Sequence, residues 1–455
     1  MGSNDENGIL GTARKVLKTQ PVCDRCLGRQ FAWLSTDTSN EERGRSIKLT
    51  LSMKAHNEIK EGRKESGTQL IALLAGNGMF GPAQTLAKRD SIDFSVEKIC
   101  YLCSVDNRSL FDRLDNIAEA AVAAVEDIEF DSFLVGSVPT PTISEREDEI
   151  RSALQILHGE TLKADFNREL GKRLQDLFDK HVEFDNPDIV IIHDMIENRI
   201  KVRVNPLFIS GRYRKLLRGV PQSRWDCKSC RGKGCEECGG TGRRYPDSIS
   251  EYVGIPAQDV TGGTKFKFHA AGREDIDVLM LGSGRPFVVE VSEPKVRNPD
   301  LKRLARRIRR DSGKKLEVLE LALSNRKRAQ ALKEEASKNV KDYGAIIRTK
   351  EEVTKEDLRR VCEEFKNLEI SQRTPRRVAH RRSDLVRTKQ IVEIRLEKKN
   401  SHTLKGFLKV QGGTYVKELV SGDDGRTTPS LSERLGTVCE CLELDVLEIH
   451  DGNRP

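Results

Sequence analysis

The stretch from Phe268 to Leu281, FHAAGREDIDVLML, places a glycine, an arginine and three acids between two apolar runs. A carboxylate held on a tight loop beside an arginine can act as a nucleophile, a general base or a metal ligand. Taken alone, such a stretch is more often a charged turn in solvent, and nothing within it selects one of these chemistries. The selection depends on motifs elsewhere in the chain.

Eight of the eleven cysteines form four pairs in which two residues separate the members. In an intracellular chain this spacing favours metal ligands over disulfides. Two distant pairs are expected to hold one tetrahedral zinc, and two pairs within one glycine-containing knuckle a second. Both zinc ions would be structural, and an iron–sulfur cluster stays the alternative at the knuckle. The predicted ligands are Cys23, Cys26, Cys100 and Cys103 for the first site, and Cys227, Cys230, Cys235 and Cys238 for the second.

Charge is distributed unevenly along the chain. Residues 1–200 carry 25 Lys and Arg against 34 Asp and Glu, whereas residues 201–455 carry 54 against 37. A basic carboxy-terminal part favours a polyanionic partner, because each neutralised phosphate releases counterions.

Two blocks concentrate the positive charge. Between Lys295 and Lys315 there are ten Lys and Arg, on a predicted helix whose apolar positions fall on one face. Between Arg373 and Lys389 there are seven. We interpret both as nucleic-acid contacts, with a solvated surface as the alternative. The cations expected to contact RNA are Arg306, Arg307, Arg309, Arg310, Arg376 and Arg377.

Strand-like and helix-like runs alternate beyond Tyr245, which predicts an α+β domain with a mostly antiparallel sheet. Before it, residues 164–180 predict an amphipathic helix, followed by strand-like runs over 187–195 and 199–216. Tyr213 lies among four cations in the basic segment 211–219. We interpret this segment as a loop that grips an RNA backbone and stacks a base.

Six motifs follow one another in a recognisable order: GREDIDV, RPFVVEVSEP, DYGAIIRT, TPRRVAHRR, GGTYVKELVSGDDGRT and LELDV. Together they resemble the archaeal and eukaryotic tRNA pseudouridine-54/55 synthases, the Pus-ten family, from Phe268 to Val446. The resemblance implies a pseudouridine synthase catalytic domain at residues 219–455, which also contains the second four-cysteine site. It implies an accessory tRNA-binding region at residues 1–218, with the first zinc site and a THUMP-like module.

Carried onto this sequence, the resemblance implies Asp275 as the catalytic aspartate, Tyr343 as the ring against the target base and Lys417 as the cation near Asp275. Isomerising uridine breaks an N-glycosidic bond and remakes it through C5, which needs a nucleophile but no redox or nucleotide cofactor. The base must be flipped out of its stack. Arg273 would fill the gap, and Glu274 and Asp277 would be only solvated or capping residues. The apolar floor is expected from Val416, Leu442 and Leu444.

The sequence therefore predicts a monomeric, cytoplasmic enzyme that modifies position 54, position 55 or both in the TΨC arm of tRNA. No apolar window is long enough for a membrane span. The alternative is a non-catalytic zinc-ribbon protein that binds tRNA or acts as a chaperone. A THUMP-bearing methyltransferase or thiolase is disfavoured, since neither a glycine-rich cofactor loop nor a pyrophosphate loop follows the module. Which carbon Asp275 attacks stays open.

Overall fold

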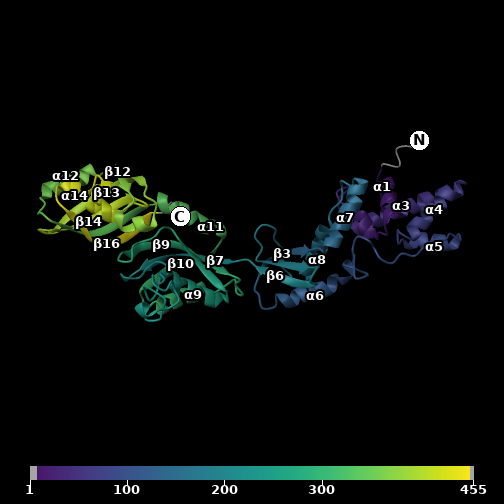
Figure 1. The fold of residues 1–455 in the computed structure, drawn as a ribbon, viewed down its shortest axis with the longest axis horizontal. Coiled ribbons are helices and arrows are strands. Elements are labelled where there is room, and N and C mark those ends of the chain that lie inside the picture. Colours follow the sequence, from purple (N-terminus) through teal and green to yellow (C-terminus); the bar gives the residue numbers. More distant parts are fainter. Residues whose placement is uncertain (1–7, 451–455) are drawn as a thin grey trace. The chain divides into compact units, whose positions relative to one another are not determined.

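The chain forms two compact units in a computed structural model that describes residues 8–450 (Figure 1). Unit 1 is Met1–Asn205 and unit 2 is Pro206–Pro455. The boundary expected after residue 218 lies inside unit 2, because residues 207–215 form a strand of the unit 2 sheet. The run 199–216 is thus two strands that belong to different sheets, with the division between units falling between them.

Helices make up the first part of unit 1. The N–H of Glu42 donates to the Ser39 hydroxyl, and the Ser39 N–H donates to the Glu42 carboxylate, so a capping box begins α3. In the same helix, buried Lys48 donates to the carbonyls of Val22 and Gly78 and so fixes the segment around the first cysteine pair. These helices are α1 (Ile9–Thr19), α2 (Asp24–Gly28), α3 (Asn40–Lys60), α4 (Lys64–Ala75) and α5 (Gly81–Arg89).

The rest of unit 1 contains a small mixed sheet in the order β4-β3-β5-β6, the helices α6 to α8 and a separate pair of short strands, β1 and β2. Strand β3 runs parallel to β4 and β5, and β6 runs antiparallel to β5. Helix α8 buries Phe166, Leu170 and Leu174, which confirms the predicted amphipathic helix. The elements are β1 (Ser104–Val105), β2 (Arg108–Ser109), α6 (Leu114–Ala124), β3 (Ser132–Val138), α7 (Pro141–Leu154), α8 (Leu162–Phe178), β4 (His181–Val182), β5 (Ile189–Asp194) and β6 (Arg199–Val204).

Unit 2 is built on a ten-stranded sheet within the described residues, in the order β10-β7-β9-β16-β11-β14-β13-β12-β15, with β8 paired to β9. All pairs are antiparallel except a short parallel contact between β9 and β16, so the predicted α+β class with a mostly antiparallel sheet is confirmed. The strands are β7 (Leu207–Lys215), β8 (Lys265–Ala270), β9 (Leu279–Ser292), β10 (Leu316–Ser324), β11 (Val340–Thr349), β12 (Leu368–Arg373), β13 (Val386–Asn400), β14 (Thr403–Gln411), β15 (Thr427–Thr428) and β16 (Cys439–His450).

Helices of unit 2 cover this sheet and bury their apolar faces against it. Helix α10 buries Leu304 and Ile308 and directs its arginines outward, as the sequence predicts. No helix among residues 8–450 has the length and apolarity that crossing a bilayer requires. The helices are α9 (Ile249–Thr261), α10 (Leu301–Asp311), α11 (Arg326–Lys338), α12 (Lys355–Glu364), α13 (Val416–Ser421) and α14 (Leu431–Leu435).

Candidate active site

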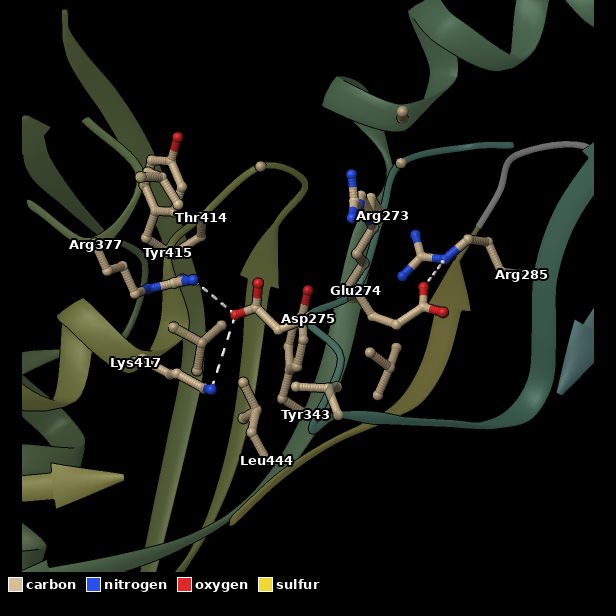
Figure 2. A pocket seen from close by; sticks show the side chains of 18 of the residues that line it. Arg273, Glu274, Asp275, Arg285, Tyr343, Arg377, Thr414, Tyr415, Lys417 and Leu444 are labelled. Carbon is tan, nitrogen blue, oxygen red and sulfur yellow. Dashed lines mark hydrogen bonds and ion pairs between the residues drawn. The ribbon is translucent and has the colours of Figure 1, made fainter. Parts of the chain in front are cut away.

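A cavity of about 430 Å³ opens in unit 2 beside the short parallel contact between β9 and β16. This volume lies within the range of small-molecule sites. The loop between β8 and β9 forms one wall, and β11, β16 and the segment leading into α13 form others (Figure 2). Asp275, Tyr343 and Lys417, which the sequence singles out, all line this one cavity.

The loop that carries Asp275 begins at Gly272, whose φ is +87°. The positive φ favours glycine, and a Cβ there would fit tightly, 3.0 Å from Nη1 of Arg285 and 3.3 Å from Nζ of Lys341. Nζ of Lys215, on β7, donates to the carbonyls of Asp275 and Ile276 at 3.2 and 2.8 Å. Burial lowers the pKa of Lys215 to about 8. The neighbouring strand therefore holds the loop backbone in place.

Glu274 is not solvated, contrary to the sequence-based expectation. Its carboxylate forms an ion pair with Arg285 at 2.8 Å, and each of these side chains is 1% exposed. The Tyr213 hydroxyl donates to the same carboxylate at 2.9 Å. Tyr213 itself is 0% exposed, and burial and the charge of Glu274 raise its pKa well above the usual value. The prediction that Tyr213 stacks an RNA base is therefore wrong, because the ring supports the loop from beneath.

Asp275 points the opposite way, into the cavity (Figure 2). Its carboxylate lies 2.8 Å from Nη1 of Arg377 and 3.8 Å from Nζ of Lys417. Arg377 also pairs with Glu418 at 2.6 Å. Burial lowers the pKa of Arg377, but the hydrogen bonds and charges of Glu418 and Asp275 outweigh it and raise the pKa above its usual value. The sequence identifies Arg377 only as an RNA contact. The nearest cation to Asp275 is Arg377, and Lys417 is the second.

Asp277 is the closer partner of Lys417, with 2.7 Å between the carboxylate and Nζ. Burial opposes ionisation of Asp277, but the hydrogen bond and charge of Lys417 outweigh it and lower the pKa of Asp277. Lys417 is thus shared between two carboxylates of one loop. We expected Asp277 to be only a solvated or capping residue, and this ion pair was not predicted.

Tyr343 and the apolar side chains form the remaining walls. Register places Tyr343 directly opposite Val446 on β16, and burial raises the pKa of the phenol. Val416 and Leu444 also line the cavity, as predicted, and are 4% and 6% exposed. Such a ring beside apolar walls suits a planar base.

Leu442 does not line the cavity, and it is 45% exposed. Along β16, Glu443 pairs with Ile346 and Cys441 with Ile347, so Leu442 is the extra residue of a β-bulge. In a regular strand, alternate side chains share a face, so Leu442 would point to the same side as Leu444. The bulge interrupts this alternation. The prediction of Leu442 in the floor is wrong for this reason.

The remaining predicted RNA contacts lie in different places. Arg273 lines the cavity, with its guanidinium 5.2 Å from the centre of the Trp225 ring. Arg376 pairs with Asp424 at 2.6 Å and is outside the cavity lining. On α10, three arginines form ion pairs with acids. Arg306 lines a separate surface groove together with Arg307 and Arg310. The pairs are Arg307–Asp259, Arg309–Glu317 and Arg310–Asp311. RNA binding by these residues stays a prediction.

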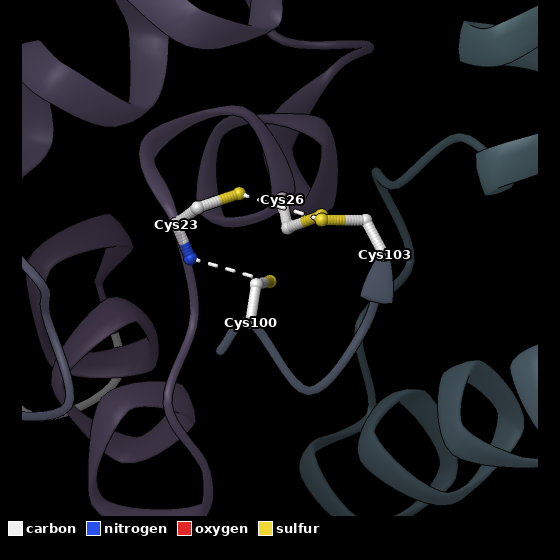
Figure 3. A group of neighbouring side chains, drawn as sticks. All are labelled: Cys23, Cys26, Cys100 and Cys103. Carbon is white, nitrogen blue, oxygen red and sulfur yellow. Dashed lines mark hydrogen bonds between the residues drawn. The ribbon is translucent and has the colours of Figure 1, made fainter. Parts of the chain in front are cut away.

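The first cysteine cluster lies in unit 1 and joins the start of α2 to the segment between α5 and β1 (Figure 3). The four Sγ atoms lie within 4.8 Å of one another, although the pairs are distant in sequence. The sulfurs of Cys23 and Cys103 are 3.9 Å apart, and the Cys23 N–H donates to Cys100 Sγ at 3.4 Å. Tetrahedral zinc with bonds of about 2.3 Å places sulfurs about 3.8 Å apart. The cluster fits one metal ion of this kind.

The second cluster is local, within residues 227–238 of unit 2. Its sulfur–sulfur distances are 3.9 Å for Cys227 with Cys235, 3.8 Å for Cys230 with Cys238 and 3.7 Å for Cys235 with Cys238. The hydrogen bond from the Cys235 N–H lowers the pKa of the Cys238 thiol. Burial opposes this effect and the Gly242 N–H adds to it, which brings the pKa to about 6. Such donors stabilise thiolates, so this cluster too could hold a metal ion.

Comparison with known proteins identifies the family of the chain. The family model described as "Pus10, C-terminal" matches residues 208–450, and that described as "Pus10 THUMP domain, archaeal" matches residues 117–194. A relative from Methanocaldococcus jannaschii named "tRNA pseudouridine synthase Pus10" is 40% identical over 444 residues, which cover 96% of this chain and 94% of the relative. A relative of the same name from Methanopyrus kandleri is 40% identical and covers 97% of this chain and 99% of its own.

A solved structure of a Cbf5–Nop10–Gar1 complex is 19% identical, with a TM-score of 0.27 and coverage of 43% of this chain and 44% of that chain. A similarity this low carries no argument. The family models and the near full-length relatives do, and they define a pseudouridine synthase, which is an isomerase. The chain belongs to the Pus10 family. A non-catalytic zinc-ribbon protein is thereby disfavoured, and the predicted THUMP module is confirmed within unit 1.

Proposed function

We propose that the chain isomerises uridine to pseudouridine in tRNA, at position 54, position 55 or both of the TΨC arm. The names of the relatives support tRNA as the substrate. The observation that carries the proposal is the position of the Asp275 carboxylate. It lies in a cavity of small-molecule size, against Arg377 and beside the ring of Tyr343.

In this proposal the Asp275 carboxylate is the nucleophile toward the target nucleoside. Arg377 and Lys417 keep it ionised and oriented, and Tyr343 packs against the flipped base. The N1–C1′ bond breaks, the C5–C1′ bond forms, and the proton lost from C5 is balanced by one gained at N1. The bond that Asp275 forms to the nucleoside breaks again within the same cycle, which regenerates the carboxylate. Product and substrate contain the same atoms, so the reaction consumes no redox or nucleotide cofactor.

The direct test is incubation of the purified chain with an unmodified tRNA transcript, without any added cofactor, followed by pseudouridine mapping. We expect pseudouridine at position 54, position 55 or both. A transcript in which both uridines are replaced by cytidine is the matched control. Modification confined to other positions, or none, would contradict the proposal.

We propose zinc as the metal at both cysteine clusters, since closed sites of four thiolates suit this ion and leave no open coordination position for chemistry. Elemental analysis should then give two zinc ions per chain and no iron. Replacing Cys100 should destabilise unit 1, because the first site joins segments far apart in sequence. Replacing Cys230 should leave unit 1 unaffected. Visible charge-transfer absorption would instead indicate iron at the second site.

We propose that residues 1–218 grip the tRNA body and that α10 adds phosphate contacts. Replacing four α10 arginines with glutamine should weaken tRNA binding and flatten its dependence on salt. The matched control replaces four exposed cations elsewhere on unit 2. An unchanged salt slope would identify α10 as solvated surface. The test set is Arg306, Arg307, Arg309 and Arg310, and the control set is Arg348, Lys350, Lys399 and Lys405.

The proposal also includes a monomeric enzyme that acts in the cytoplasm. Light scattering on the purified chain, alone and with tRNA, would check the first part. Cell fractionation would check the second.

A further inference from the structure

Cations outnumber acids among the side chains that line the cavity. Only two of the lining residues are acids, Glu274 and Asp275. Glu274 is held by Arg285, and Asp275 by Arg377 and Lys417. Four further cations contribute to the lining: Arg273, Lys333, Lys341 and Arg382.

Lys341 is the most buried of these four. It lies on β11 two residues before Tyr343, so both side chains project from the same face of the sheet, and both line the cavity. The residue is 5% exposed. Its ammonium lies near Gly272, at the start of the loop that carries Asp275, where a Cβ on Gly272 would be 3.3 Å from Nζ.

Lys341 lines the cavity, and no carboxylate or carbonyl within residues 8–450 forms an ion pair or hydrogen bond with its ammonium. The acid whose charge acts on Lys341, Glu274, is already occupied by Arg285 and Tyr213. Burial and repulsion from Arg285 and Lys389, partly offset by Glu274, lower the pKa of Lys341 to about 7. A buried ammonium without an anion is unfavourable, and an anion that enters the cavity would stabilise it.

We propose that Lys341 binds a backbone phosphate of the flipped nucleotide inside the cavity. The inference rests on the proposed function, because the substrate must be RNA. Before the N1–C1′ bond breaks, uracil is neutral, so in the bound substrate the phosphates supply the anion. Residues two apart on a strand face lie about 6–7 Å apart, so a base against Tyr343 would bring an adjoining phosphate towards Lys341. Lys341 would then contact the substrate directly rather than support the fold.

The experiment uses the full chain and tRNA assembled with a single methylphosphonate at one phosphate beside the target uridine. Methylphosphonate keeps the shape of the phosphate and removes its charge. We expect Lys341→Met to lower kcat/KM on ordinary tRNA by about 10–100-fold, the effect of losing one charged contact of about 1.5–3 kcal/mol. Lys341→Arg should restore part of it. With methylphosphonate at the contacted position, wild type and Lys341→Met should have the same kcat/KM.

Lys327→Met is the matched control, since Lys327 is an exposed lysine of α11 outside the cavity lining. It should leave the penalty for each methylphosphonate unchanged. If the losses of kcat/KM caused by Lys341→Met and by methylphosphonate add at every phosphate tested, the inference is overturned. If Lys341→Met does not fold, the same comparison with Lys341→Arg decides, because a longer, differently shaped cation should alter the penalty at the contacted phosphate only. Wild-type protein that forms no pseudouridine in ordinary tRNA would instead contradict the proposed function.

Discussion

Two consecutive carboxylates of one loop each meet an arginine at 2.8 Å, yet their surroundings differ. The Glu274–Arg285 pair is 1% exposed on each side, whereas Asp275 and Arg377 are 32% and 37% exposed. Figure 2 shows the two carboxylates pointing away from each other, one toward Arg285 and the other toward the cavity. The first pair is part of the core, and the second remains accessible to a substrate.

Since the two distances are equal, burial decides how much each pair contributes to stability. Removing one partner of a buried pair leaves an uncompensated charge and costs about 3–5 kcal/mol. An exposed pair contributes about 0–1 kcal/mol to stability. Glu274 therefore holds the loop, whereas the Asp275 carboxylate stays accessible from the cavity.

The largest expected effect on activity is that of Asp275→Asn. The change keeps the shape of the side chain but removes its charge and nucleophilicity. We expect no detectable pseudouridine, tRNA affinity near that of wild type and a free energy of unfolding within about 1 kcal/mol of wild type. Pseudouridine mapping, filter binding and urea unfolding measure the three quantities. Substantial activity in this variant would remove Asp275 from the mechanism.

Glu274→Gln should have the largest effect on stability. It leaves the Arg285 guanidinium buried without an anion, so the free energy of unfolding should fall by about 3–5 kcal/mol. Activity should fall as well, because the loop that positions Asp275 loses its anchor. Urea unfolding of unit 2, compared with the Asp275→Asn variant, tests the contrast. Equal stability of the two variants would show that the buried pair is no more structural than the exposed one.

Arg377→Met and Lys417→Met should separate the two cations around Asp275. Arg377 is the nearer, so its loss should lower kcat/KM on the order of 10²-fold, the scale of losing one electrostatic contact in an active site. Lys417→Met should lower it less. Single-turnover kinetics on both variants check the order. A larger defect in Lys417→Met would identify Lys417 as the functional partner, as the family resemblance implies.

Asp277→Asn should have the smallest effect, with kcat/KM within a few-fold of wild type. Its effect should instead be visible in acid. The folded pKa of Asp277 is depressed, so ionised Asp277 stabilises the fold above its ordinary pKa, and this contribution is lost as pH falls through the folded value. The variant should be slightly less stable than wild type at pH 7 and equal to it in strong acid. Urea midpoints across that range measure the difference. The same gap at all pH values would show that the Lys417 ion pair is not its source.

Much of the site could be predicted from local sequence. The glycine, arginine and aspartate of the loop between β8 and β9, the paired cysteines and the strand containing Tyr343 are short-range features, and they occur where the sequence indicates. The residues missed were Arg377 as the partner of Asp275, and Lys341 and Arg285 as parts of the cavity. The only sequence signal for Arg377 was its place in a basic block.

The amino-acid sequence was enough to establish the order of the motifs, the class of the sheet and the spacing of the metal ligands, because these depend on residues close together in the chain. Tertiary structure decided which charges meet and which side chains are buried. Arg377 reaches Asp275 from about a hundred residues away, and Tyr213 lies beneath the loop although its neighbours suggest an exposed surface. A β-bulge at Leu442 turns this side chain outward. Ion pairing, burial and strand register depend on packing between distant segments, and no local pattern contains that information.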